Sequence, residues 1–204
     1  MTIKRLIASL GMTGIAAAVI PMAQAQDEGP IPAVYIGDLD GFSTAEKMAY
    51  AIGAVQTMAY MEATTSEDYA LAACIAGQER VAYQTLIAGD ADDLAAIEIE
   101  ASVQEACENE TNESTGTLLR ASDADEWFGG GRSETERAMF VLGLSDITFF
   151  RVYTRVDEEV STCVREMTQV IMTADNAFSE SFLEAPSDPL VEDLVDKPVN
   201  VCLE

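Results

Sequence analysis

The chain contains no histidine, and this absence excludes several kinds of site at once. Ser-His-Asp and Cys-His catalysis both need an imidazole, as do histidine-containing zinc sites and the attachment motif of c-type haem. The sequence also lacks the GxSxG, P-loop and GxGxxG motifs. We therefore expect a protein that is not an enzyme and that has no catalytic residues, no metal site and no cofactor.

Basic residues are scarce, with 11 Lys and Arg against 36 Asp and Glu and a formal net charge of −25. A surface of this sign repels nucleic acid and anionic membranes, since both are bound through cationic side chains. The candidate partners that remain are cations and basic proteins, such as a basic envelope protein. Alternatively, the acidity keeps the protein in solution and indicates no partner.

No apolar run reaches the roughly 20 residues that a membrane-spanning helix needs. The longest, Leu6 to Ile20, follows two basic residues and precedes the small-x-small site Ala23-Gln24-Ala25. This order predicts a secretory signal peptide at residues 1–25, with an N-terminal anchor helix as the alternative. Its removal leaves 9 bases against 36 acids, a net charge of −27. We expect a periplasmic or secreted protein that has no membrane span once the signal is removed.

The four cysteines are an even number, which in an exported chain indicates two disulfides: Cys74, Cys107, Cys163 and Cys202. Sequence alone leaves three pairings open. A metal site is the weaker interpretation, because no two cysteines have C-x-x-C spacing and no histidine completes a zinc set.

An internal repeat organises the chain. Residues 43–56 (STAEKMAYAIGAVQ) and 133–146 (SETERAMFVLGLSD) align without a gap at an offset of 90 positions. A cysteine follows the first serine after 31 residues in one copy and after 30 in the other. A repeat of this kind carries more weight than other signals when the architecture is predicted. It favours one disulfide within each half, Cys74 with Cys107 and Cys163 with Cys202.

Each copy begins with the pattern of a capping box, Ser43 with Glu46 and Ser133 with Glu136. The serine hydroxyl and the glutamate carboxylate satisfy the first free backbone amides of a helix. Apolar residues then recur at spacings of three and four, which predicts amphipathic helices.

Two later stretches of the sequence are ambiguous between helix and strand. Residues 97–103 alternate as a strand does, and residues 147–153 are rich in strand-forming side chains. We predict helix for both, because neighbouring residues favour helix and the helical seam continues unbroken. A further helix is expected from a Ser66 cap to a terminating Gly89.

These patterns predict an all-α fold of two pseudo-repeated helical hairpin units, each stapled by a disulfide. The expected order is an irregular lead-in, a first helical repeat, a linker that ends in three glycines, and a second helical repeat with a proline-rich C-terminal tail: residues 26–42, 43–107, 108–132 and 133–204.

Gly53 and Gly143 occupy equivalent positions inside the two repeated helices. A glycine inside a helix costs about 1 kcal/mol relative to alanine, so its recurrence indicates that another backbone approaches closely. Gln56 and Asp146 follow one turn later on otherwise apolar faces. They either form hydrogen bonds across the repeat interface or line a small pocket.

Residues 50–56 (YAIGAVQ) and 140–146 (FVLGLSD), each preceded by Glu-Lys or Glu-Arg and followed by a cysteine, resemble the small exported immunity proteins of bacterial type VI secretion systems. The resemblance covers roughly 30 residues in each half. It implies a helical, periplasmic, disulfide-stapled protein that neutralises a peptidoglycan amidase toxin by binding, and it assigns no contact to an individual residue.

The preferred function is therefore that of an exported, non-enzymatic binding protein, such as an inhibitor of another envelope protein. An acidic protein that protects or solvates other proteins under stress is one alternative. A hydrolase that uses paired carboxylates is another, since acids are abundant. The oligomeric state is left open.

Overall fold

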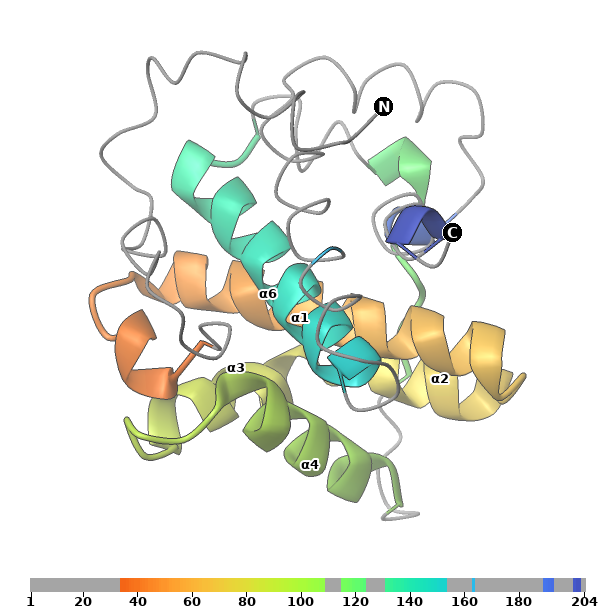
Figure 1. Ribbon diagram of the computed structural model, residues 1–204, viewed down its shortest axis with the longest axis horizontal. Coiled ribbons are helices and arrows are strands. Elements are labelled where there is room, and N and C mark those ends of the chain that lie inside the picture. Colours follow the sequence, from red (N-terminus) through yellow and green to blue (C-terminus); the bar gives the residue numbers. More distant parts are fainter. Residues whose placement is uncertain are drawn as a thin grey trace. The chain divides into compact units, whose positions relative to one another are not determined.

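The computed structural model describes several segments of the chain: residues 34–108, 115–123, 131–153, 163, 189–192 and 200–202. The predicted signal peptide, the beginning of the lead-in, much of the linker and most of the proline-rich tail lie outside these segments. The described residues all belong to one unit, Ala33–Glu204. Most of them are helical and none of them forms a strand, which confirms the all-α prediction (Figure 1).

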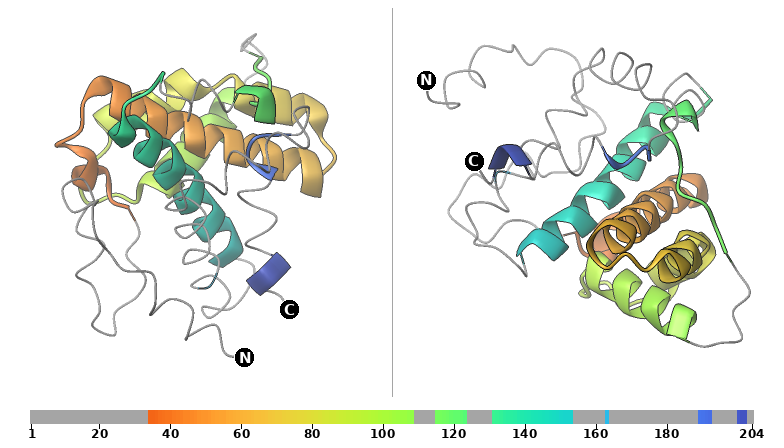
Figure 2. Two further views of the ribbon diagram at one scale, coloured as in Figure 1. Left: turned by 90° about the horizontal axis from the view of Figure 1, so that it is seen from above. Right: turned by 90° about the vertical axis from the view of Figure 1, so that its right-hand side faces the viewer.

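Helix α1, Thr44–Thr65, is the centre of the described structure. Its capping box forms as predicted: the Ser43 N–H donates to Glu46 Oε2 at 2.7 Å, and the Glu46 N–H donates to Ser43 Oγ at 3.3 Å. Every residue from 49 to 61 is buried. A helix that is buried on all sides must be surrounded by other elements. Helix α6 (Glu134–Tyr153) packs against one side of α1, and α2 (Tyr69–Ala76) and α3 (Glu79–Ala88) lie on the other (Figure 2). Helix α4 (Ala95–Glu108) packs mainly on α3 and also contacts α1 and α6.

The predicted helix from Ser66 to Gly89 is wrong in two respects. The chain forms two helices there, α2 (Tyr69–Ala76) and α3 (Glu79–Ala88), separated by Gly77 and Gln78. Glycine is a poor helix former, and the buried Gln78 side chain turns back to donate to the Cys74 carbonyl at 3.3 Å. The cap is also different, since Asp68 rather than Ser66 accepts from the Leu71 N–H at 2.9 Å.

Helix α4, Ala95–Glu108, covers the strand-like residues 97–103 and confirms the helical prediction. It buries one face at helical spacing, through Ala95, Ala96, Ile99 and Val103. An isolated bridge between Tyr35 and Leu94 holds its N-terminal end, where the Ala95 N–H donates to the Val34 carbonyl at 2.9 Å.

Part of the expected irregular lead-in is ordered as one 3-10 turn, η4, at Ile36–Leu39. Its two apolar ends, Ile36 and Leu39, are buried. Backbone hydrogen bonds from Ile36 and Gly37 to the chain between α3 and α4 fix the turn in place, at 2.9 Å and 3.0 Å. A second short turn, η5 (Ala121–Asp123), lies in the expected linker.

Helix α6, Glu134–Tyr153, begins with the second predicted capping box, whose two hydrogen bonds measure 2.8 Å and 3.1 Å. It includes the strand-like residues 147–153 and so confirms the helical prediction there. It crosses α1 along the middle of both helices (Figure 1).

Both predicted disulfides are present, in the pairing that the repeat favours: Cys74 with Cys107 and Cys163 with Cys202. They close loops with sequence separations of 33 and 39 residues. The first joins the C-terminal part of α2 to the last turn of α4, and so fixes one end of α4 to the rest of the helices.

Replacing Cys74 and Cys107 together with alanine is expected to lower the free energy of unfolding by about 2–5 kcal/mol. The variant lacks the cross-link that restricts the unfolded chain, so its unfolded state gains conformational entropy. Urea denaturation followed by circular dichroism measures the change. An unaltered denaturation midpoint would contradict the role given to this disulfide.

Candidate functional site

The crossing of α1 and α6 brings together both glycines that the repeat singled out. A Cβ built on Gly53 would lie 2.8 Å from the carbonyl carbon of Phe140 and closer still to its oxygen. A Cβ built on Gly143 would lie 2.9 Å from the carbonyl carbon of Tyr50, again closer to the oxygen. Each glycine therefore lies directly on the backbone of the opposite helix, and no other residue fits without a shift of that backbone.

These contacts are reciprocal. The next atom that a Cβ on Gly53 would meet is the Leu144 nitrogen at 3.1 Å, and the next one for Gly143 is the Ala54 nitrogen, also at 3.1 Å. Leu144 lies 90 positions after Ala54, as Gly143 does after Gly53. The two repeated helices therefore present equivalent surfaces to each other.

The polar residues of the repeat take different partners. The Tyr50 hydroxyl donates to Asp146 Oδ2 at 2.6 Å across the crossing, where both side chains are buried. Phe140, which stands in the place of Tyr50 in the other copy, has no hydroxyl to offer Gln56. Gln56 binds the chain of the expected linker instead: its amide donates to the Thr117 carbonyl at 3.4 Å, and it accepts from a backbone N–H at 2.8 Å.

Replacing Tyr50 with phenylalanine is expected to cost about 1–3 kcal/mol of stability, since it removes a donor from a buried carboxylate. Thermal unfolding followed by circular dichroism measures the loss. The matched control is Tyr69→Phe, because Tyr69 is 70% exposed and its substitution should leave the melting temperature unchanged. Equal stability of Tyr50→Phe and the wild type would contradict the role of this hydrogen bond.

A buried ion pair that sequence reasoning missed joins α4 to α6. Arg151 is 6% exposed, and its Nη2 donates to Glu100 Oε1 at 2.9 Å while its Nη1 reaches the Met58 carbonyl at 3.5 Å. Glu100 Oε1 also accepts from Gln104 at 3.2 Å, whereas its Oε2 is buried and has no hydrogen-bond partner among the described residues. The signal in the sequence was a single arginine inside the apolar stretch 147–153.

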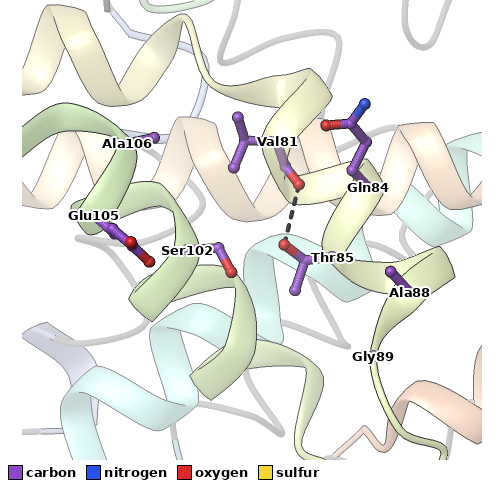
Figure 3. Close-up of a pocket in the computed structure, with 8 residues that line it drawn as sticks. All are labelled: Val81, Gln84, Thr85, Ala88, Gly89, Ser102, Glu105 and Ala106. Atoms are coloured by element: carbon purple, nitrogen blue, oxygen red, sulfur yellow. Dashed lines mark hydrogen bonds between the residues drawn. The ribbon is translucent and has the colours of Figure 1, made fainter. Parts of the chain in front are cut away.

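An open groove lies between α3 and α4, on residues that sequence reasoning did not single out (Figure 3). Its volume is about 490 Å³, and its lining is mostly small or apolar: Val81, Gln84, Thr85, Ala88, Gly89, Ser102, Glu105 and Ala106. The Thr85 hydroxyl donates to the Val81 carbonyl at 3.0 Å within α3. The lining therefore comes from α3, the residue that follows it and α4, and Glu105 carries its one carboxylate.

Two glutamates outside the groove have shifted pKa values. Burial raises the pKa of Glu79, at the start of α3, and the charge of Arg132 opposes this rise in part. The pKa of Glu136 is lowered, mainly because the Ser133 backbone N–H donates to its carboxylate, with a further contribution from the Ser133 hydroxyl. The shift at Glu136 thus arises from the capping box.

Among the residues that the structure describes, no three Cys, Asp or Glu side chains are grouped closely enough to hold a metal ion. Within the same part of the chain, no helix combines the length and the apolar character that crossing a bilayer requires. Comparisons of the chain with protein-family models, curated proteins and solved structures found no match.

Proposed function

We propose that the protein is an exported, non-enzymatic binding protein that holds a partner, such as an envelope enzyme that it inhibits, on the outer face of α3 and α4. The observation that carries this proposal is the groove between these two helices, which is open to solvent on a helical framework. Concave surfaces between helices are common places for binding.

The framework behind the groove suits a binding role because several contacts fix it. Helix α1 supports α3 and α4 from behind and is itself buried on all sides. The disulfide between Cys74 and Cys107 holds the C-terminal end of α4, and the bridge at Leu94 holds its N-terminal end. Sites built on rigid helices keep their geometry better than sites on loops.

The finer architecture belongs to the same proposal. We infer that the second half continues from α6 as a helical hairpin and stacks on the first through the glycine-bearing helices, α1 and α6. The reciprocal contacts of Gly53 and Gly143 support this arrangement. The remainder of the second hairpin falls outside the described residues.

The proposed cellular location is the periplasm or the outside of the cell. Two disulfides support it, because such bonds persist in oxidising compartments. The predicted signal peptide at residues 1–25 supplies the route. The resemblance to immunity proteins adds a candidate class of partner, peptidoglycan-cleaving amidases that the protein would neutralise by binding.

The test is an affinity capture from the envelope extract of the source organism with the oxidised mature protein, followed by reconstitution with the purified partner. One stoichiometric partner that binds the purified protein would support the proposal. A broad set of unfolded clients, captured only at low pH, would replace it with the protective function. Turnover of peptidoglycan or soluble glycans by the protein alone would replace it with a hydrolase.

A further inference from the structure

We propose that one stretch of the linker and one stretch of the C-terminal tail open together as a single unit, which the side chain of Gln56 holds closed while the helices stay folded. The first stretch, residues 116–120, is called the strap below, and the second, residues 189–192, the tail segment. This device lies outside the groove between α3 and α4, and it does not depend on which partner the protein binds.

Three hydrogen bonds to its backbone hold the strap on α1 and α2 (Figure 2). The Gly116 N–H donates to the Ala73 carbonyl of α2 at 2.8 Å. The side chain of Gln56 on α1 then binds the strap twice, since its amide donates to the Thr117 carbonyl at 3.4 Å and its oxygen accepts from the Leu119 N–H at 2.8 Å. Residues 116–119 belong to no helix or strand, so these bonds and the packing around them place the strap.

Gln56 is the residue that latches the strap to α1. Its side chain is 1% exposed, and a buried amide needs both an acceptor and a donor. The strap supplies the two from residues two positions apart, which an extended chain presents on the same side. Leucine is similar in size and forms neither bond. Gln56→Leu therefore removes the latch with little change in shape.

The tail segment is held on the strap through the same residue that Gln56 binds. The Leu119 carbonyl accepts from the Leu190 N–H at 2.6 Å, and an isolated bridge joins Arg120 to Pro189. Leu119 is thus bonded to α1 through its N–H and to the tail segment through its carbonyl. When Gln56 releases Leu119, the acceptor of the Leu190 N–H leaves with it, so the two stretches open together.

The helices do not need these bonds to stay folded. An α-helix pairs its backbone groups within itself, and α1 is packed on α6 through Gly53 and Gly143. Segments with few such contacts open locally, at a lower free energy than global unfolding. Opening of the unit uncovers Leu190 and Val191, which are 0% and 1% exposed when it is closed. An apolar surface then becomes accessible on a protein whose helices are intact.

The test is native-state hydrogen exchange of the oxidised mature protein, followed by NMR at increasing urea concentration. The reporter amides are the N–H groups of Gly116, Leu119 and Leu190. They should share one free energy of opening and one small urea dependence, because the urea dependence measures the surface that an opening exposes. The helix amides of Val55 in α1 and Leu144 in α6 should show the larger urea dependence of global unfolding.

Two substitutions should open the unit from opposite ends. Gln56→Leu should accelerate exchange at all three reporter amides by the same factor, about tenfold or more, since it removes two hydrogen bonds. Gly116→Ala should act in the same way with the latch intact, because a Cβ there would lie 2.5 Å from the Ala76 carbonyl carbon and 2.6 Å from the Gly77 nitrogen.

Each substitution has a matched control. Gln84→Leu makes the same change on the exposed surface of α3, and Gly41→Ala adds a Cβ that would meet no heavy atom within 4 Å. Both controls should alter the exchange rates of the reporter amides by less than about threefold. Circular dichroism spectra check that all four variants are folded.

Three results would overturn the inference. One is a urea dependence of the reporter amides equal to that of the helix amides, which would make both stretches part of the global core. Another is faster exchange at Leu119 but not at Leu190 in Gln56→Leu, which would show that the tail segment is held independently. The third is unchanged exchange at Leu190 in Gly116→Ala. The first result needs no variant, so it decides even if a substituted protein fails to fold.

Discussion

Replacing Gly53 with alanine is expected to destabilise the protein by about 3 kcal/mol, although alanine is the better helix former by about 1 kcal/mol. The added methyl group would meet the backbone of Phe140, and a backbone cannot rotate aside as a flexible side chain can. The two helices must therefore move apart, which weakens the packing along the whole crossing. Gly143→Ala should have a similar effect through the backbone of Tyr50.

Urea denaturation of the two single variants and the double variant measures these losses. The double variant should cost less than the sum of the two, because both substitutions separate the same pair of helices. The matched control is Gly41→Ala: a Cβ there would have no heavy atom within 4 Å, so stability should be unchanged or slightly higher. A Gly53→Ala protein as stable as the wild type would refute the close crossing.

The second large effect is expected at the buried ion pair. Arg151→Met should cost about 3 kcal/mol or more, because it leaves the carboxylate of Glu100, whose side chain is only 18% exposed, without its cationic partner. Replacing both residues, as Arg151→Met with Glu100→Leu, should recover most of this loss, since no charge then stays buried.

Thermal and urea unfolding at neutral pH measure both variants. The matched control is Asp40→Asn, which removes the charge of a 75% exposed side chain that lies 3.8 Å from Lys47. Exposed pairs contribute about 0–1 kcal/mol, so this control should change stability little. A double variant that is no more stable than Arg151→Met would show that the arginine acts by packing alone.

The elements that were predicted correctly have signals within a few neighbouring residues. The capping boxes of Ser43 and Ser133 each fix a helix start through a contact three residues away. The disulfide pairing followed from the repeat, because each half contains two cysteines. These features required no knowledge of how distant segments pack.

The missed features depend on contacts between segments that are distant in the sequence or on a choice between similar local signals. Ser66 and Asp68 both have side chains that can cap a helix, and the sequence does not show which one does. The partners of Gln56 lie more than 60 positions along the chain. The groove exists only because α3 and α4 pack side by side, so no single stretch of sequence contains it.

The reciprocal crossing of α1 and α6 is the interface that a two-fold symmetric homodimer has, here formed within one polypeptide. Dilution cannot separate its halves, since they are joined covalently. Each half is also free to change alone, whereas a substitution in a homodimer appears on both sides. The two sides of this crossing do differ. Tyr50 of α1 donates to Asp146 of α6, whereas the residue of α6 equivalent to Tyr50 is Phe140, which has no hydroxyl to donate to Gln56 of α1. Gln56 binds the linker instead.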